Sequence, residues 1–277
     1  MTATLENRVA LVTGAGRGIG RAIALKYAAE GARLVINDLE RDVAESVAEE
    51  VREIGSEAAV CHGSVTAPDF AERYIGTAVK AFNGIDIIVN NAGYTWDSVI
   101  QKMTDEQWYA ILDCHMTAPF RILRAAQPVI RNAVKAEQAE NRRTVRKIVN
   151  ISSAAGMFGN PGQINYAAAK AGIMGMTMTL AKEWGRLNTC VNAVAFGLVS
   201  TRLTTTTADS NTTVNIDGRD LKIGVNPELM TAMESAIPLG RAGTPEEAAG
   251  AVYMMTIPES DYVSGQTLLC SGGLTGI

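Results

Sequence analysis

Long apolar segments are missing from this sequence. No segment reaches the roughly 18 consecutive apolar residues that a membrane span requires. The opening residues MTATLENRVALVTG carry no basic region ahead of their short apolar run, so they do not have the pattern of a secretory signal. We therefore expect a cytoplasmic protein with no membrane partner.

Metal ligands are also scarce. The sequence has two histidines, His62 and His115, and four cysteines that lie far apart without a C-x-x-C spacing. Zinc sites and disulfide frameworks use closely spaced histidines and cysteines. We therefore expect no metal site, and buried free thiols are the favoured interpretation of the cysteines at 61, 114, 190 and 270.

A strong charge imbalance and an inter-domain linker are missing as well. Charged residues make up 19% of the chain, hydrophobic residues 47%, and the net charge is −4. Such an even, mildly acidic composition gives no reason to expect a nucleic-acid partner. We expect one domain over residues 1–277, with a substrate-lid insertion at about 201–240.

The sequence does contain a regular alternation of apolar runs and amphipathic segments. RVALVTG (8–14), a helical segment at 18–31 and RLVIND (33–38) make one strand–helix–strand unit. Further strands are expected at 57–62, 85–90, 147–152, 189–195 and 266–270, and further helices at 40–55, 68–83, 104–138, 163–186 and 245–257. Because the strand segments are apolar throughout, we predict an α/β fold with a doubly wound parallel sheet of about seven strands and helices on both faces.

A glycine-rich turn, TGAGRGIG, follows the first expected strand and carries Gly14, Gly16, Gly18 and Gly20. Glycine lets a backbone turn tightly and approach a pyrophosphate, whose charge the following helix N-terminus attracts. Tight packing alone is the alternative. The position between a first strand and its helix favours dinucleotide phosphate binding.

Asp38 follows the second expected strand. A carboxylate at this place accepts a hydrogen bond from the ribose 2′-OH of NAD and repels the 2′-phosphate of NADP. NAD is therefore the expected cofactor, although Arg17 and Arg41 are near enough in sequence that NADP is not excluded. The alternative is that Asp38 caps the helix expected at 40–55.

Polar residues also follow the fourth and fifth expected strands, as NNAG (90–93) and as Ser152 and Ser153 in ISSAAG. Tyr166 and Lys170 stand four residues apart in NYAAAKAG, so they share one face of the expected helix. They form either a surface pair or a phenol whose pKa is lowered by the lysine.

Together the motifs T-G-x-x-x-G-x-G, N-N-A-G, a serine thirteen residues before a tyrosine, and Y-x-x-x-K resemble the short-chain dehydrogenase/reductase family. The segments GNPGQINYAAAKAGIMGMT and IPLGRAGTPEEAA are most similar to 3-oxoacyl-(acyl-carrier-protein) reductases and related 3-hydroxyacyl-CoA dehydrogenases. The resemblance implies a single-domain Rossmann fold, usually a homotetramer, that moves hydride between nicotinamide and a carbonyl or secondary alcohol. It implies that Tyr166 is the acid/base, that Ser153 holds the carbonyl oxygen, and that Lys170 lowers the tyrosine pKa and binds the nicotinamide ribose.

The same resemblance implies which residues contact the dinucleotide. These are Gly14, Gly16, Arg17, Gly18, Ile19, Gly20, Asp38, Leu39, Ser64, Val65, Asn91, Ala92, Gly93, Tyr166, Lys170, Val199 and Thr201.

The chain departs from the family pattern in three places. His115 stands where the family has an asparagine that helps hold a water in the proton path, so a histidine in the relay and a histidine that only fills space are both open. Ser64 replaces an acidic residue that meets the adenine, and Phe196 replaces a proline after the sixth strand. Thr201 still matches a threonine that contacts the carboxamide of nicotinamide.

Two insertions remain. The segment 134–147 carries Arg142, Arg143, Arg146 and Lys147, and a solvated helix end and loop is favoured there over a docking patch for an acidic carrier. In the segment 201–240, Leu229, Met230, Met233 and Ile237 recur at helical spacing. They form either an apolar substrate lid or a helix packed on the core.

We expect an NAD(P)(H)-dependent oxidoreductase acting on a small-molecule or acyl-thioester substrate, a 3-oxoacyl/3-hydroxyacyl pair being favoured. The alternatives are a dehydrogenase of another apolar alcohol, such as a steroid or terpenoid, and a dinucleotide-binding sensor without turnover.

Overall fold

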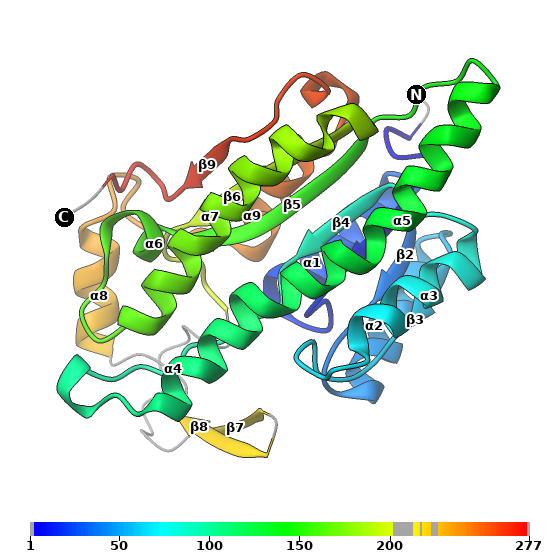
Figure 1. The fold of residues 1–277 in the computed structure, drawn as a ribbon. Helices are drawn as coiled ribbons and strands as arrows, with labels where there is room; N and C mark the ends of the chain where they lie inside the picture. Colours follow the sequence, from blue (N-terminus) through cyan, green and yellow to red (C-terminus); the bar gives the residue numbers. More distant parts are fainter. Residues whose placement is uncertain (1–2, 202–212, 217, 223–226, 276–277) are drawn as a thin grey trace.

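The computed structural model describes residues 3–201, 213–216, 218–222 and 227–275. Its centre is a seven-stranded sheet in the order β3-β2-β1-β4-β5-β6-β9, and every neighbouring pair in it is parallel. The strands are β1 (Val9–Val12), β2 (Arg33–Ile36), β3 (Ala58–Val60), β4 (Ile87–Asn90), β5 (Arg146–Ser153), β6 (Thr189–Phe196) and β9 (Thr267–Cys270). The predicted doubly wound α/β fold is confirmed (Figure 1).

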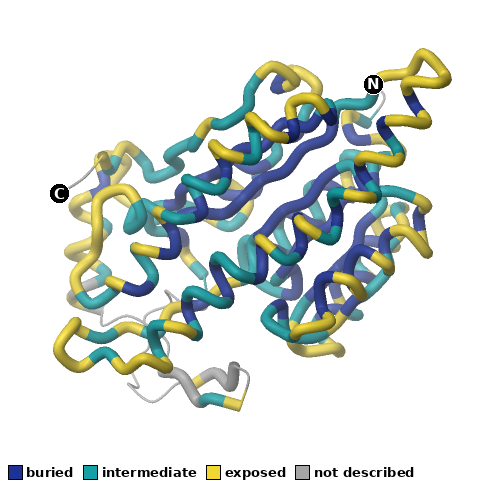
Figure 2. Tube along the Cα trace, in the orientation of Figure 1, coloured by how far each residue is buried: buried dark blue, intermediate teal, exposed yellow. Residues whose placement is uncertain are grey.

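Helices cover both faces of the sheet (Figure 1). One apolar core lies under α1 (Gly18–Ala29), α2 (Arg41–Glu53) and α9 (Pro245–Met254). The other lies under α3 (Phe70–Phe82), α5 (Ala118–Ala139) and α7 (Ile164–Trp184). The inner strands β1, β2, β4, β5 and β6 are buried almost throughout, whereas the edge strands β3 and β9 are half-buried (Figure 2). Burial on both faces is why the inner strands are largely apolar rather than alternating.

The region expected as one helix over 104–138 is divided. It consists of α4 (Asp105–Leu112), a π-helical turn (Asp113–Thr117) and α5. Thr104 caps α4 because its hydroxyl accepts a hydrogen bond from the backbone N–H of Gln107. The turn adds a residue to the helical ladder next to the end of β4, a change that hydrophobic periodicity does not register.

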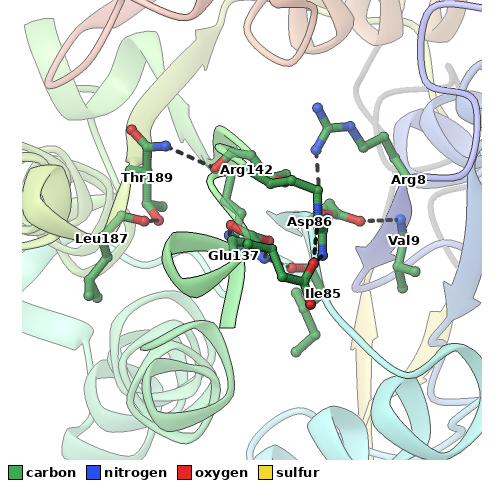
Figure 3. Close-up of polar contacts among 12 residues, drawn as sticks. Arg8, Val9, Ile85, Asp86, Glu137, Arg142, Leu187 and Thr189 are labelled. Carbon is green, nitrogen blue, oxygen red and sulfur yellow. Dashed lines mark hydrogen bonds and ion pairs between the residues drawn. The ribbon is translucent and has the colours of Figure 1, made fainter. Parts of the chain in front are cut away.

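Two charged residues of the 134–147 segment are buried, contrary to the expected solvated loop. Arg146 is the first residue of β5 and forms two hydrogen bonds with the carboxylate of Glu137, at 2.6 and 3.2 Å. Figure 3 shows this region around Glu137. The ammonium of Lys147 lies 2.8 Å from the carboxylate of Asp261. The expected exposure to solvent holds for Arg142 and Arg143. It is wrong for Arg146 and Lys147, because acidic residues pair with these two charges inside the fold.

The 201–240 region contains an antiparallel hairpin, β7 (Thr213–Ile216) and β8 (Arg219–Lys222), and helix α8 (Pro227–Ser235). Residues 202–212, 217 and 223–226 of the expected lid lie outside the described residues, as does the side chain of Leu229. Of the other apolar residues, Ile237 is buried, Met230 is half-buried and Met233 is exposed. A short helix, α6 (Ala154–Phe158), follows β5 directly.

Candidate active site

The segments that carry the predicted site follow the strands at one edge of the sheet. The glycine-rich turn follows β1, Asp38 follows β2, the NNAG segment ends β4, and Ser153 ends β5. Because all seven strands are parallel, these segments meet at the carboxyl edge, where ligands bind in doubly wound sheets. Helix α6, helix α4 and the hairpin lie at this end of the molecule (Figure 1).

The glycines of the turn are required by close contacts. Gly14 has a φ of +61°, which L side chains rarely adopt. A β-carbon added to Gly20 would overlap the carbonyl oxygen of Gly14, and one added to Gly16 would lie 2.6 Å from the carboxylate of Asp38. Because these positions carry no side chains, the backbone of the turn passes close to the N-terminus of α1. This cradle fits the pyrophosphate of a dinucleotide.

Asp38 joins the glycine-rich turn to the start of α2. Its Oδ2 accepts a hydrogen bond from the backbone N–H of Gly16 at 3.1 Å, and its Oδ1 accepts one from Glu40 at 3.2 Å. Glu40 itself is the N-cap of α2, without a side-chain capping bond. Each carboxylate oxygen keeps a lone pair for a further donor, so Asp38 fits the hydroxyls of an adenosine ribose.

The NNAG segment fixes the turn from the other side. The amide of Asn91 donates to the backbone carbonyls of Thr13 and Gly14, at 2.9 and 3.1 Å. The hydroxyl of Thr13 accepts from the N–H groups of Asn91 and Ala92, both at 3.0 Å. The side chain of Asn91 therefore holds the end of β4 against the end of β1.

The remaining predicted cofactor residues lie at the same edge but differ in burial. Val65 and Val199 are buried, and the hydroxyls of Ser64 and Thr66 are hydrogen-bonded to each other at 2.8 Å. The methyl of Thr201 lies 3.6 Å from the position that a β-carbon on Gly18 would take. The segment after β6 therefore reaches the glycine-rich turn. Ile19 and Leu39 belong to the same two post-strand segments, and Leu39 is exposed.

Helix α7 presents Tyr166 and Lys170 beside the end of β5. The ammonium of Lys170 donates to the carbonyl of Ile151 at 2.7 Å, and the hydroxyl of Ser152 donates to the carbonyl of Lys170 at 2.8 Å. These two bonds fix the register of α7 against β5. They place the phenol of Tyr166 within hydrogen-bonding reach of Ser153.

Burial shifts the pKa values of both Tyr166 and Lys170. Burial raises the pKa of Tyr166 to about 12, although its hydrogen bond with Ser153 acts in the opposite direction. Burial also lowers the pKa of Lys170 to about 8. Burial thus disfavours the phenolate more than the hydrogen bond with Ser153 favours it. The expected lowering of the tyrosine pKa by Lys170, together with the positive nicotinamide ring of the oxidised cofactor, stays a prediction.

His115 lies in the π-helical turn and contacts Tyr166. The two rings meet edge to face, with centroids 5.1 Å apart. Nε2 of His115 lies 2.7 Å from the carbonyl oxygen of Tyr94, so it carries the proton, while the buried Nδ1 has no protein partner among the described residues. Burial and the charge of Lys170 lower the histidine pKa well below 6.5. His115 is therefore a neutral imidazole with a bare acceptor nitrogen.

Asn165 is a positioning residue that the sequence pattern does not reveal. It is fully buried, and its amide donates to the carbonyls of Trp96 and Gln107, both at 3.1 Å. Its carbonyl oxygen accepts from the N–H of Tyr166 at 2.8 Å. The start of α7 is thereby fixed to the loop after β4. A single amide next to the tyrosine gives no periodic signal that could have indicated this.

Arg219 of the hairpin is another residue that the sequence pattern does not indicate. Its guanidinium lies over the ring of Trp96, 5.6 Å from the centroid, and donates to the carboxylate of Glu106 at 2.8 Å. The hairpin is thus anchored to α4 and to the loop after β4.

No helix among the described residues is long and apolar enough to cross a membrane. Within the same part of the chain, no three His, Cys, Asp or Glu side chains are grouped so that they could hold a metal ion. Cys61, Cys114 and Cys190 are buried and Cys270 is half-buried, and none of these four described thiols is in a disulfide.

Comparisons with known proteins agree with this geometry. Residues 8–212 match the family described as short chain dehydrogenase. A 3-oxoacyl-[acyl-carrier-protein] reductase of Synechocystis is 38% identical over 276 residues, which cover 99% of each chain. Enzymes of the same name from Vibrio cholerae and Thermotoga maritima are each 36% identical over 270 residues, covering 98% of each chain.

Proposed function

The chain belongs to the short-chain dehydrogenase family and is an NAD(P)-dependent oxidoreductase acting on a carbonyl or a secondary alcohol, and we propose that its substrate is a 3-oxoacyl thioester. The relatives named for that substrate match nearly the whole chain. The observation that carries the catalytic part of the proposal is the placement of Tyr166 between Ser153 and Lys170 at the carboxyl edge of the sheet.

The reduction needs a proton donor and a hydrogen-bond donor at the carbonyl oxygen, because hydride transfer leaves negative charge there. The nicotinamide cofactor supplies the hydride when bound. Tyr166 protonates the oxygen, and Ser153 donates a hydrogen bond to it. Lys170, 5.5 Å from the centre of the tyrosine ring, stabilises the phenolate that is left and binds the nicotinamide ribose.

His115 completes the proposed proton path. Its Nδ1 is a buried acceptor, and its ring contacts Tyr166. A neutral imidazole can hold a water through this nitrogen or take the place of one. We therefore assign His115 to the replacement of the proton that Tyr166 gives up.

The proposed cofactor is NAD rather than NADP. Asp38 offers a carboxylate beside the cradle that the glycine-rich turn provides for the dinucleotide. A carboxylate binds the ribose hydroxyls of NAD and repels a 2′-phosphate. The same proposal includes a single domain and a cytoplasmic homotetramer, as the family resemblance implies.

The test is a panel of acetoacetyl-CoA, longer 3-oxoacyl thioesters and simple ketones, followed at 340 nm with NADH and with NADPH. Preference for the thioesters with NADH is the expected result. Higher kcat/KM with steroid or terpenoid ketones would reassign the substrate. Cofactor binding without turnover of any ketone would favour the sensor.

A further inference from the structure

The cofactor edge contains a charge cluster formed by Asp38, Arg17 and Glu40. The guanidinium of Arg17 donates two hydrogen bonds to the carboxylate of Glu40, at 2.5 and 3.2 Å. Glu40 is joined in turn to Asp38, because its backbone N–H donates to Oδ1 of that residue. The three side chains carry a net charge of −1.

Arg17 is the cation of this cluster, and it stands in the glycine-rich turn next to Gly16, whose N–H binds Asp38. Interaction with Glu40, and more weakly with Asp38, raises the pKa of Arg17 above its ordinary value. A guanidinium at this place is a natural partner for a phosphate, which it binds through two parallel hydrogen bonds. Here both hydrogen bonds are made to Glu40 instead.

We propose that Glu40 is a specificity-determining residue that selects NAD over NADP by occupying Arg17. The inference rests on the proposed cofactor preference and extends it, because Glu40 then contributes to the selection of NAD over NADP in addition to Asp38. A 2′-phosphate meets two carboxylates and an arginine already engaged by one of them. A ribose hydroxyl needs only the carboxylate of Asp38.

The position of Glu40 makes it a good discriminator. It is the N-cap of α2 and contributes no side-chain capping bond, so its carboxylate is not needed for the helix. The side chains of Arg17 and Glu40 are 39% and 54% exposed, so loss of the pair should cost the fold little stability. Replacing Glu40 with Gln removes one negative charge and leaves Arg17 able to turn to a phosphate.

The test measures binding of NADH and NADPH by fluorescence titration, and binding of 5′-AMP and adenosine 2′,5′-bisphosphate by calorimetry, without any substrate. In Glu40→Gln the ratio of NADPH to NADH dissociation constants should fall about tenfold, because the 2′-phosphate no longer has to displace Glu40 from Arg17 and no longer meets its negative charge. The two adenosine fragments should shift in the same direction. Circular dichroism checks that the variant is folded.

Two further variants control the result. Glu53→Gln makes the same charge change at the exposed far end of α2, and it should leave the ratio unchanged. In the double variant Arg17→Gln/Glu40→Gln, most of the improvement in NADPH binding relative to NADH should disappear. A ratio within about twofold of the parent in Glu40→Gln would overturn the inference, as would an equal gain without Arg17.

The outcomes separate the two proposals. A parent that prefers NADH but does not respond to Glu40→Gln contradicts the role of Glu40 alone. A parent that prefers NADPH, or binds neither dinucleotide, contradicts the proposed cofactor preference and this inference together.

Discussion

Gly93 packs against the imidazole of His115, so closely that a β-carbon at position 93 would overlap Cε1 of the ring and lie 2.9 Å from Nδ1. His115 is buried, with 3% of its surface exposed. Tyr94 and Tyr166 contact the ring on other sides. The ring therefore has little room to move.

Gly93→Ala should accordingly destabilise the fold by about 1–3 kcal/mol, the cost of overpacking a well-packed site. Urea denaturation measures this. Gly175→Ala in α7, where nothing lies within 4 Å of the added carbon, should be neutral or stabilising. If overlap with the imidazole is the cause, His115→Asn should relieve much of the loss in the double variant, and an unrelieved loss would place the cause elsewhere.

Tyr166→Phe should lower turnover by about two to four orders of magnitude, the contribution of a positioned general acid. Cofactor binding should be unaffected, because only the hydroxyl is removed. Steady-state kinetics and a binding titration separate these effects. Tyr109→Phe, in the exposed part of α4, is the control. Near-parental turnover of Tyr166→Phe would remove the proposed mechanism.

Asp38→Ala should weaken NADH binding by about 1–3 kcal/mol and improve NADPH relative to it, since a charge-assisted hydrogen bond is lost. Asp42→Ala, which removes an exposed carboxylate from the first turn of α2, should change neither affinity. Both are measured by fluorescence titration. Stronger NADPH binding by the parent would show that Arg17 or Arg41 dominates the choice.

His115→Leu should bind cofactor normally but lose turnover, whereas His115→Asn should keep much of it, because the amide retains an acceptor. The sequence alone predicts a histidine ionisation near pH 6.5 in the rate profile. The buried ring instead stays neutral from well below that value upward, so no ionisation near 6.5 is expected. The rate of carbonyl reduction should fall only near pH 8, where Lys170 loses its proton. Unchanged turnover in His115→Leu would leave the residue with a packing role.

Glu137→Gln should cost about 3 kcal/mol of unfolding free energy, because it leaves Arg146 buried without its counter-charge. Burial alone would raise the pKa of Glu137, but the hydrogen bonds and charge of Arg146 lower it below the ordinary 4.5. The stabilisation is therefore complete above pH 4.5 and is lost as the pH falls through the lower, folded value. The urea midpoints of the parent and of Glu137→Gln, measured across this pH range, should converge in acid. Glu140→Gln, which breaks an exposed pair with Arg142, should have little effect.

The sequence predicts the sheet well because burial on both faces makes each strand an apolar run. It also predicts which post-strand segments meet, since parallel strands bring their carboxyl ends to one edge. Ser153 and Tyr166 come together in this way and are hydrogen-bonded to each other, and their catalytic roles stay a prediction.

What could not be predicted depends on contacts between distant residues. In the sequence, Arg146 and Lys147 belong to a basic segment that is typical of a solvated surface. Only the fold shows that Glu137 and Asp261 pair with them. The titration of Tyr166 depends on how deeply α7 packs, which its spacing from Lys170 does not reveal. The π-helical turn that directs His115 to Tyr166 breaks the helical period by one residue.

The long ladder between β5 and β6 has a consequence for local opening. Eight residue pairs run in register from Arg146 and Thr189 to Ser153 and Phe196, and both strands are buried over almost their whole length. Amide hydrogens in such a ladder exchange with solvent only when a large part of the molecule opens. Ser153 is the last residue of this ladder, whereas Arg219 belongs to a separate two-stranded hairpin. We therefore expect the backbone at Ser153 to open on a slower time scale than the hairpin, whose two strands lie outside the main sheet.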